Sequence, residues 1–276
     1  MRAVCSLCPH HCALEEGQTG LCRGRENRGG TVVCANYGRL TSVAVDPIEK
    51  KPFRHFHPGQ YILSAGSYGC NLHCPFCQNH EISMAGAEAP VEQVSPERLA
   101  ELAAQLTHTL RGNLGVAFTY NEPLISYEYV RDTARILKEQ GLCTVLVTNG
   151  MIEAEPLQQL LPLVDAMNID LKGFSQTYSD WLGGDFDTVR RTIAAAVQAC
   201  HVEVTTLIVP GKNDAPADME REAAWLAELS ADIPLHISRF FPRYQVMDLP
   251  AAPVETIERL CRVAGKRLKY VYAGNC

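Results

Sequence analysis

Three cysteines in one short segment have the spacing of a metal-binding loop. Cys70, Cys74 and Cys77 follow the pattern C-x3-C-x2-C within residues 69–79. Cysteine thiolates are soft ligands that select iron–sulfur clusters, zinc or Cu(I). A structural site is normally closed by four such ligands, so three cysteines on a [4Fe-4S] cluster would leave one iron open. The pattern therefore favours a reactive centre over a purely structural one.

Two simpler interpretations of this segment stay open. His73 or His80 could supply a fourth ligand and complete a zinc site. The three cysteines could also be ordinary buried residues, because free cysteine behaves as a small hydrophobic side chain.

A second group of cysteines lies near the N-terminus, where Cys5, Cys8, Cys12 and Cys22 follow the pattern C-x2-C-x3-C-x9-C. This segment has too few apolar residues for a core of its own, so we expect a metal to stabilise it. Four cysteines suit a tetrahedral zinc site or a second iron–sulfur cluster, and the sequence does not separate the two. Cys34 lies in a strand-like run and is predicted not to be a ligand.

The composition is that of a folded chain with many cysteines. Its 276 residues are 46% hydrophobic, which is enough for one large α/β domain. The formal net charge of −6 argues against a general nucleic-acid or anionic-membrane partner. No apolar run reaches the ~18 residues of a membrane helix, and no signal-peptide core is present. We therefore expect a cytoplasmic protein whose 12 cysteines include metal ligands.

Beyond residue 58 the sequence alternates between short apolar runs and amphipathic stretches. This rhythm predicts strands that alternate with helices, and hence parallel strands joined by right-handed crossovers. The predicted strands cover residues 61–64, 115–119, 143–147, 166–171, 202–209, 235–238 and 268–272. About six repeats predict an α/β fold with a partial (β/α)6 TIM-like barrel over residues 59–276, after a cysteine-rich, metal-stabilised segment over residues 1–58.

The functional site of such a barrel lies where the strands end, and polar residues gather at these predicted positions. They are Asn121 and Glu122, Thr148 and Asn149, Asp170 and Lys172, Glu203 and Thr206, and His236 and Arg239. A carboxylate and an amide can hold an ammonium group, and a charged pair at the end of an apolar strand is costly unless it is used. Simpler interpretations are turns for the asparagines, a structural ion pair for Asp170 and Lys172, and a satisfied core position for His236.

The cysteine loop resembles that of radical S-adenosylmethionine (SAM) enzymes, which also have an aromatic residue, here Phe76, before the last cysteine. In that superfamily the three cysteines hold a [4Fe-4S] cluster, and the amino and carboxylate groups of SAM chelate the fourth iron. An electron from the cluster cleaves SAM to methionine and a 5′-deoxyadenosyl radical, which abstracts hydrogen from a substrate. The resemblance thus implies a [4Fe-4S] cluster and SAM as cofactors.

Further motifs are similar to one branch, the radical SAM member of the AmmeMemoRadiSam system, which is related to the pyruvate formate-lyase activating enzyme. The matching segments are C-x-x-C-P-H-H-C at 5–12, C-P-F-C-Q-N at 74–79, F-T-Y-N-E-P at 118–123, N-I-D-L-K-G-F at 168–174, V-E-V-T-T at 202–206 and H-I-S-R-F-F-P at 236–242. They extend over nearly the whole chain.

The resemblance implies SAM-binding roles for residues in these motifs. Asn121 and Glu122 occupy the position that binds the SAM amino group, although Tyr-Asn replaces the family's Gly-Gly here. Asp170 and Lys172 would contact the methionyl carboxylate and the ribose. The other implied cofactor contacts are Phe76, Gln78, Thr148, Asn149, Thr206, His236 and Arg239. No residue is assigned to the substrate step.

The branch implies Memo-like and AMMECR-like partner proteins, and the chemistry implies a reductant such as flavodoxin or ferredoxin. It does not identify the substrate. Members of this branch usually continue past Gly274 and Asn275 with a cysteine-containing tail. This sequence ends at Cys276, so we expect the role of that tail to be absent. Two alternatives remain: an activase of a glycyl-radical enzyme, which would have to admit a protein loop, and a non-catalytic metal-binding interaction module.

Overall fold

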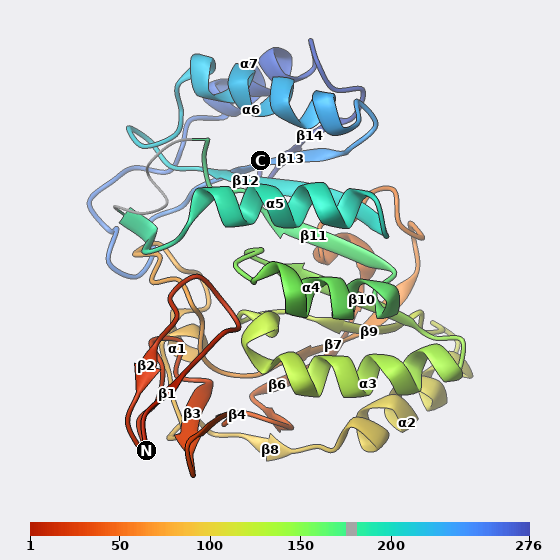
Figure 1. The fold of residues 1–276 in the computed structure, drawn as a ribbon. Coiled ribbons are helices and arrows are strands. Elements are labelled where there is room, and N and C mark those ends of the chain that lie inside the picture. The colour runs from red at the N-terminus through yellow and green to blue at the C-terminus, as the bar shows by residue number, and fades with distance from the viewer. Residues whose placement is uncertain (175–180) are drawn as a thin grey trace.

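An eight-stranded sheet forms the centre of the computed structural model, which describes residues 1–174 and 181–276 (Figure 1). Its strands lie in the spatial order β14-β13-β12-β11-β10-β9-β7-β6. They are β6 (Ser42–Pro47), β7 (Tyr61–Gly66), β9 (Gly115–Phe118), β10 (Cys143–Thr148), β11 (Ala166–Asp170), β12 (His201–Ile208), β13 (Leu235–Arg239) and β14 (Val271–Gly274). The spatial order follows the chain, so successive strands are added at the same edge.

The sheet is mostly parallel. Neighbours from β7 to β14 pair in parallel, whereas β6 pairs with β7 in the antiparallel direction. In the middle of the sheet, Val145 of β10 lies opposite Ala117 of β9 and Ala166 of β11, and all three are fully buried. Parallel neighbours require crossover connections, which the helices provide. The prediction of an α/β architecture with a mostly parallel central sheet is confirmed.

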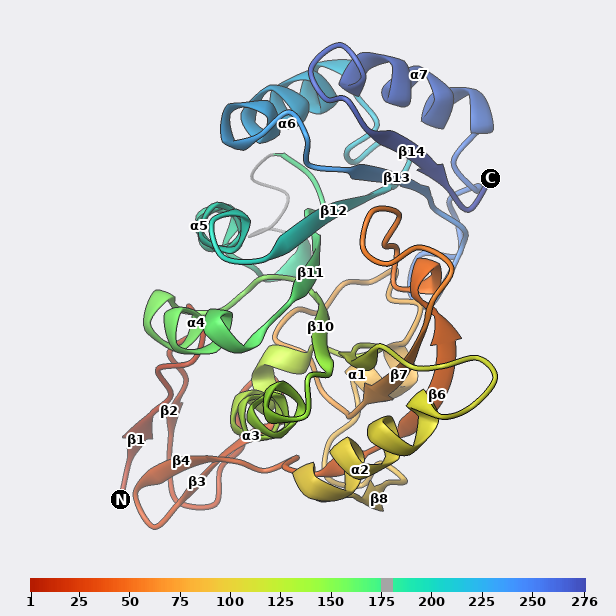
Figure 2. The same cartoon turned by 90° about the vertical axis from the view of Figure 1, so that its right-hand side faces the viewer.

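The longer helices lie along the outer side of the curved sheet (Figure 2). They are α2 (Pro96–Thr107), α3 (Tyr127–Glu139), α4 (Ala154–Leu160), α5 (Phe186–Val197), α6 (Pro216–Leu229) and α7 (Val254–Ala264). The start of α2 is capped: the Ser95 side chain accepts a hydrogen bond from the Arg98 N–H, and Pro96 takes the first helical position. Leu99 of α2 and Leu137 of α3 are fully buried on the faces that pack toward the sheet.

The helix α4 ends in the 3-10 helix η3 (Leu161–Leu163), because Pro162 cannot donate a helical hydrogen bond. One predicted strand has different bounds in the structure. The last strand begins at Val271 rather than at residue 268. Leu268 instead donates its N–H to the Ala264 carbonyl at 3.0 Å, in the turn that follows α7.

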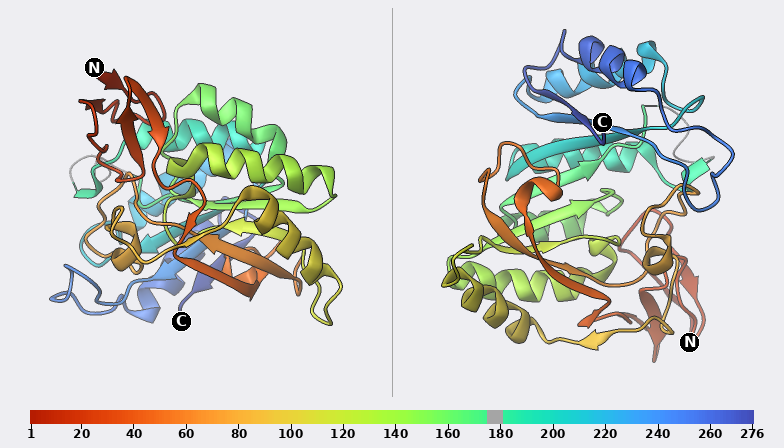
Figure 3. Two further views of the ribbon diagram at one scale, coloured as in Figure 1. Left: turned by 90° about the horizontal axis from the view of Figure 1, so that it is seen from below. Right: turned by 180° about the vertical axis from the view of Figure 1, so that it is seen from behind.

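The N-terminal segment contains short antiparallel strands. They are β1 (Ala3–Val4), β2 (Ala13–Leu14), β3 (Arg25–Arg28), β4 (Thr31–Cys34) and β5 (Arg39–Leu40), and β5 pairs with β8 (Glu92–Gln93). Seen from behind, these strands lie beside α1 (His80–Ser83), which directly follows the cysteine loop (Figure 3). The predicted boundary between residues 58 and 59 falls between β6 and β7, which are paired strands of one sheet.

A loop between β6 and β7 fills the concave side of the sheet, and we call residues 48–60 the floor loop. It includes the 3-10 helix η1 (Ile48–Lys50) and the fully buried Phe53. The backbone N–H groups of Arg54 and His55 donate to the Glu203 carboxylate at 3.0 and 2.8 Å, and Asn168 donates to the Pro52 carbonyl at 2.8 Å. These contacts hold the floor loop against β11 and β12. The polar side chains Glu203 and Asn168 are therefore paired with the protein's own backbone.

Within the described part of the chain, no helix has both the length and the apolar composition that a membrane span requires.

Candidate functional site

The three cysteines of the central motif line one cavity at the C-terminal ends of the strands. Cys70 follows β7, and a turn in which the Cys77 N–H donates to the Cys74 carbonyl at 3.1 Å brings the last two cysteines together. The residues that share this cavity come from the C-terminal ends of the parallel strands and from the cysteine loop. They include Cys70, Cys74, Phe76, Cys77, Gln78, Asn121, Glu122, Thr148, Asn149, Asp170, Lys172, Thr205 and Ser238. The side chains predicted to gather at the strand ends are therefore largely together.

The sulfur atoms surround the cavity rather than meeting at one point. Among residues 1–174 and 181–276, no three His, Cys, Asp or Glu side chains converge closely enough for a single metal ion. The two histidines of the zinc alternative point elsewhere: the His73 ring lies against Gly183, and His80 stacks on Tyr244 with ring centroids 4.4 Å apart.

The thiols of this site lie in surroundings that disfavour free thiolates. Burial raises the pKa of Cys70 well above its usual value and raises the pKa of Cys74 to about 11. The nearby Lys172 ammonium lowers the pKa of Cys74 and so opposes part of this effect. Thiols with such pKa values become ligands when a metal displaces their protons. A cavity lined by three thiols and a lysine therefore fits an iron–sulfur group held by three cysteines.

Gly69 allows the cysteine loop to lie against the N-terminal segment. Its φ of +86° is in the left-handed region, and an added Cβ would meet the Cys22 carbonyl oxygen at 2.3 Å. The Gly69 N–H also donates to the Ile82 carbonyl at 2.9 Å. The entry into the cysteine motif is thus fixed by backbone contacts on both sides.

We expect the Gly69→Ala substitution to lower the free energy of unfolding by about 2–4 kcal/mol, from left-handed strain and a backbone clash together. Urea unfolding of the metal-free protein measures this change. Gly59→Ala is the matched control, because Gly59 has a φ of +82° but open space around the position of an added Cβ. It should cost only about 1 kcal/mol, and equal effects of the two substitutions would show that the contact with Cys22 is unimportant.

Glu122 is a buried carboxylate at the end of β9. It accepts hydrogen bonds from the Thr148 hydroxyl at 2.6 Å, the Asn149 N–H at 2.8 Å and the Leu124 N–H at 2.9 Å. Burial nevertheless raises the pKa of Glu122 to about 7, so its ionised form is short of a positive partner. The carboxylate is therefore held in a fixed place beside the cavity and suits a cationic or proton-donating ligand.

Asn121 holds the backbone of the cysteine loop. Its carbonyl oxygen accepts from the Ser67 N–H at 2.9 Å, and its amide donates to the carbonyls of Tyr68 and Gly69, each at 3.1 Å. Because these contacts occupy both ends of the amide, Asn121 is suited to positioning the loop. The adjacent Tyr120 has a φ of 73°, so it adopts the backbone conformation for which glycine is favoured. Its hydroxyl donates to Asp46 at 2.8 Å.

Asp170 and Lys172 extend from the end of β11 with their charged groups 2.8 Å apart. Both line the cavity and are partly buried. Asn149, at the end of β10, donates its amide to the Cys70 sulfur at 3.6 Å and to the Asn71 side chain at 2.9 Å. Carboxylate, ammonium and amide groups thus surround the three thiols on the strand side of the cavity.

The structure places three predicted SAM contacts away from this cavity. Thr206 lies on the opposite face of β12 from Thr205 and donates to the buried Glu222 of α6 at 2.5 Å. His236 lies deeper in the sheet than Ser238, and its ring nitrogen is 2.6 Å from Glu203. The simpler interpretation of His236 as a satisfied core residue therefore describes its contacts in the structure.

Arg239, the third of them, lies in an adjoining cavity. It shares that cavity with Arg243, and Phe76 and Gln78 line both spaces. The Phe76 ring packs against Trp181 with centroids 5.0 Å apart. The two cavities are therefore neighbours along the cysteine loop.

The four N-terminal cysteines also lie together. Cys5, Cys8, Cys12 and Cys22 line a separate small cavity, and the metal site predicted there stays a prediction. Cys34 lies in β4 and donates to the Asn36 side chain at 3.1 Å.

Asn71 is a residue of the site that the sequence motifs did not indicate. Its amide donates to the Met151 carbonyl at 2.8 Å, its carbonyl oxygen accepts from Asn149, and its backbone oxygen is 2.7 Å from the His10 ring. The one available signal was its place directly after Cys70. Its partners are distant in the sequence, so their contact could not be anticipated.

A thiol-lined cavity at the carboxyl ends of parallel strands, flanked by charged groups, is a suitable place for a metal-containing cofactor and a small charged molecule in an α/β protein. The chain belongs to the radical SAM superfamily, whose family pattern matches residues 65–226. Proteins of this superfamily are enzymes, and membership implies a [4Fe-4S] cluster and SAM.

Individual proteins agree with this assignment. The chain is 42% identical over 276 residues to Uncharacterized protein MJ0808 of Methanocaldococcus jannaschii, covering 98% of this chain and 80% of that protein. It is 28% identical over 153 residues to Pyruvate formate-lyase 1-activating enzyme of Escherichia coli, covering 53% of this chain and 60% of that enzyme. The match thus spans less than two thirds of the activase.

The fold is also similar to that of a solved structure, Streptococcus suis SuiB bound to S-adenosylmethionine. The TM-score is 0.56 at 12% identity, covering 78% of this chain and 49% of that one. At this identity the similarity supports the fold alone.

Proposed function

We propose that this protein is a cytoplasmic enzyme that reductively cleaves SAM and uses the resulting radical to abstract hydrogen from a substrate. One observation carries the proposal: Cys70, Cys74 and Cys77 line the same cavity as Glu122, Asp170 and Lys172. We interpret the curved, open sheet as a partial (β/α)6 barrel, which supplies such a site at its strand ends. The substrate class stays open.

The cofactors supply the difficult chemistry, since a [4Fe-4S] cluster donates the electron that breaks a carbon–sulfur bond of SAM to give methionine and the 5′-deoxyadenosyl radical. Cys70, Cys74 and Cys77 would hold three irons of the cluster. Lys172, which stabilises the Cys74 thiolate, would offset part of the negative charge of the site. Asn149 would donate a hydrogen bond to the Cys70 sulfur, as it does in the structure.

The protein groups around the open iron suit the polar ends of SAM. Glu122 is held by three hydrogen bonds and can accept from the SAM amino group. Lys172 can pair with the methionyl carboxylate, and Asp170 with the ribose hydroxyls. Phe76 and Gln78, which line both cavities, would separate SAM from a substrate in the adjoining cavity. There Arg239 could pair with an anionic substrate group, and no direct SAM contact is proposed for Thr206 or His236.

We also propose that the chain belongs to the AmmeMemoRadiSam branch, on the strength of the motifs at residues 5–12, 118–123 and 236–242. Memo-like and AMMECR-like proteins would then be its partners, and a flavodoxin or ferredoxin its reductant. Cys5, Cys8, Cys12 and Cys22 would form a second metal site in an N-terminal unit that we place at residues 1–58.

An activase of a glycyl-radical enzyme is the second candidate, and the similarity to Pyruvate formate-lyase 1-activating enzyme favours it. A radical signal that appears in a glycyl-radical protein after incubation with this enzyme and SAM would support it. A non-catalytic metal-binding module would take up metal without responding to SAM.

The test is the electron paramagnetic resonance (EPR) spectrum of the anaerobically reconstituted, dithionite-reduced protein with and without SAM. We expect SAM to change the signal of the cluster. In Glu122→Gln we expect a roughly 10–100-fold higher SAM concentration for the same change, because one hydrogen bond to a charged group is lost. Glu155→Gln, an exposed position on α4, should match the wild type. A spectrum that SAM leaves unchanged would refute the proposed function.

A further inference from the structure

The N-terminal cysteines surround a space that the proposed SAM site does not use. The β1–β2 hairpin places Cys5 beside Cys12, with the Cys5 N–H donating to the Cys12 carbonyl at 2.9 Å. Cys8 lies in the turn of this hairpin, and Cys22 approaches just before β3, so that all four line one cavity. Protein interiors are normally close-packed. A small space bordered by four thiols is therefore a candidate ligand site.

The surroundings suit an anionic, thiolate-bound group. Cys5, Cys8 and Cys22 are buried. Arg25 lines the same cavity and is itself buried. Arg25 is fixed in this place by a two-pronged ion pair with Glu128 of α3. A positive group is thus held beside the four thiols, where it would offset the negative charge of thiolate ligands.

The geometry favours a cluster over a single ion. Zinc draws four sulfur atoms to ~2.3 Å from one point and leaves no space between them. An iron–sulfur cluster places its own iron and sulfide between the cysteines. The four N-terminal cysteines line one small cavity, and among the described residues no three His, Cys, Asp or Glu side chains converge as a single ion would require.

One residue, Asn71, lies between the two cysteine sites in space. The Asn71 side chain lies beside Cys8 of the N-terminal site. Asn71 directly follows Cys70 of the SAM site, and Asn149 donates both to Asn71 and to the Cys70 sulfur. In addition, the His10 ring is 2.7 Å from the Asn71 carbonyl, and Gly69 packs against the Cys22 carbonyl. Two redox centres in these positions would be close enough to exchange electrons directly.

We propose that Cys5, Cys8, Cys12 and Cys22 hold a second [4Fe-4S] cluster, which relays electrons to the cluster at Cys70, Cys74 and Cys77. A low-potential one-electron carrier protein would reduce the N-terminal cluster by one electron. That electron then passes to the second cluster, so the N-terminal cluster returns to its oxidised state and no atom is transferred. The relay rests on the proposed function, whereas the presence of the N-terminal cluster does not.

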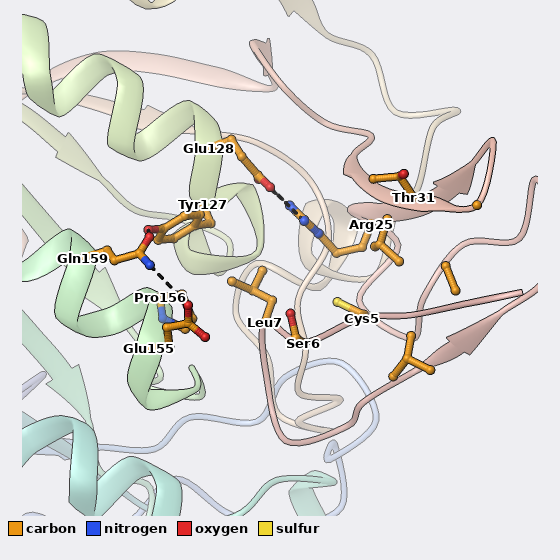
Figure 4. A pocket seen from close by; sticks show the side chains of 14 residues that line it. Cys5, Ser6, Leu7, Arg25, Thr31, Tyr127, Glu128, Glu155, Pro156 and Gln159 are labelled. Carbon is orange, nitrogen blue, oxygen red and sulfur yellow. Dashed lines mark hydrogen bonds and ion pairs between the residues drawn. The ribbon is translucent and has the colours of Figure 1, made fainter.

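The N-terminal site borders a second cavity through Cys5 and Arg25. Cys5 lies at the edge of an open cavity between the N-terminal segment and the helices α3 and α4, which is also lined by Tyr127, Glu128 and Glu155 (Figure 4). A carrier that approached from this side would not need to cross the SAM cavity. Electrons could therefore enter while SAM and a substrate occupy the other site.

The first test counts metal in a variant that lacks the SAM-site ligands, Cys70→Ala/Cys74→Ala/Cys77→Ala. After anaerobic reconstitution we expect about four irons and four sulfides per chain, against about eight of each in the wild type. About one zinc per chain in this variant, or no metal, would overturn the cluster. The total in the wild type provides a second measure that requires no substitution. Neither count depends on SAM cleavage.

The second test addresses the closeness of the two clusters and the relay. In the fully reduced wild type we expect the EPR lines to be broadened by coupling between the clusters. Cys8→Ser/Cys22→Ser and the triple variant should each give an uncoupled spectrum. A wild-type spectrum equal to the sum of the two variants would overturn the closeness. Reduced flavodoxin should reduce the remaining cluster of Cys8→Ser/Cys22→Ser at least tenfold more slowly than in the wild type, and an equal rate would overturn the relay.

Discussion

Replacement of Cys74 by alanine is expected to remove about four irons per chain and to abolish SAM cleavage. Cys74 is a buried thiol in the middle of the cysteine loop, and alanine offers no ligand in its place. The cluster would keep only Cys70 and Cys77, and two thiolates do not hold a [4Fe-4S] cluster that also has an open iron. Iron analysis and the absorption spectrum of the reconstituted variant measure the loss.

Cys261→Ala is the control for this prediction. Cys261 is a partly buried cysteine within α7, where alanine favours the helix. We expect it to retain the full iron content and activity. If Cys74→Ala also retained them, Cys74 would not be a cluster ligand.

Replacement of Glu203 by alanine is expected to lower the free energy of unfolding by about 3–5 kcal/mol. Glu203 is fully buried and accepts hydrogen bonds from His201, from His236 and from the N–H groups of Arg54 and His55. The substitution leaves the floor loop and His236 without these partners inside the protein. Glu220→Ala on α6, which removes an exposed ion pair with Arg267, should cost less than about 1 kcal/mol.

Glu203 should also make the free energy of unfolding depend on pH. Burial alone would raise the pKa of Glu203, but the hydrogen bonds from His201, His236 and the floor loop outweigh it and hold the pKa at about 2. The folded-state pKa is below the unfolded value near 4.5, so this stabilisation is present above pH 4.5 and is lost as the pH falls toward 2. Urea unfolding between these pH values should show a smaller decline for Glu203→Gln than for the wild type. Parallel curves would contradict the assignment.

Features set by local spacing could be predicted from the sequence. The C-x3-C-x2-C loop and the capped start of α2 depend on residues a few positions apart. The alternation of strands and helices predicted parallel pairing, and parallel pairing brings Glu122, Asn149 and Asp170 to one edge of the sheet. This part of the site follows from the pattern because strand ends meet whatever the exact register is.

Features set by strand orientation and distant contacts could not be predicted. Thr205 and Thr206 are chemically alike, and the sequence did not show which of them faces the cavity, because a shift of one residue exchanges the two faces of a strand. His236 lies on the inner face but too deep to reach the cavity, where Glu203 holds it. The floor loop carries no local signal that its backbone will pair with a strand some 150 residues away.

The most direct test of the central claim is the formation of 5′-deoxyadenosine by the anaerobically reconstituted wild-type protein with dithionite and SAM. We expect 5′-deoxyadenosine and methionine in equal amounts, and neither product from Cys74→Ala. Both products should also be absent when dithionite is left out. A fully reconstituted, reduced protein that binds its iron but leaves SAM intact would contradict the account and would favour a metal-binding module.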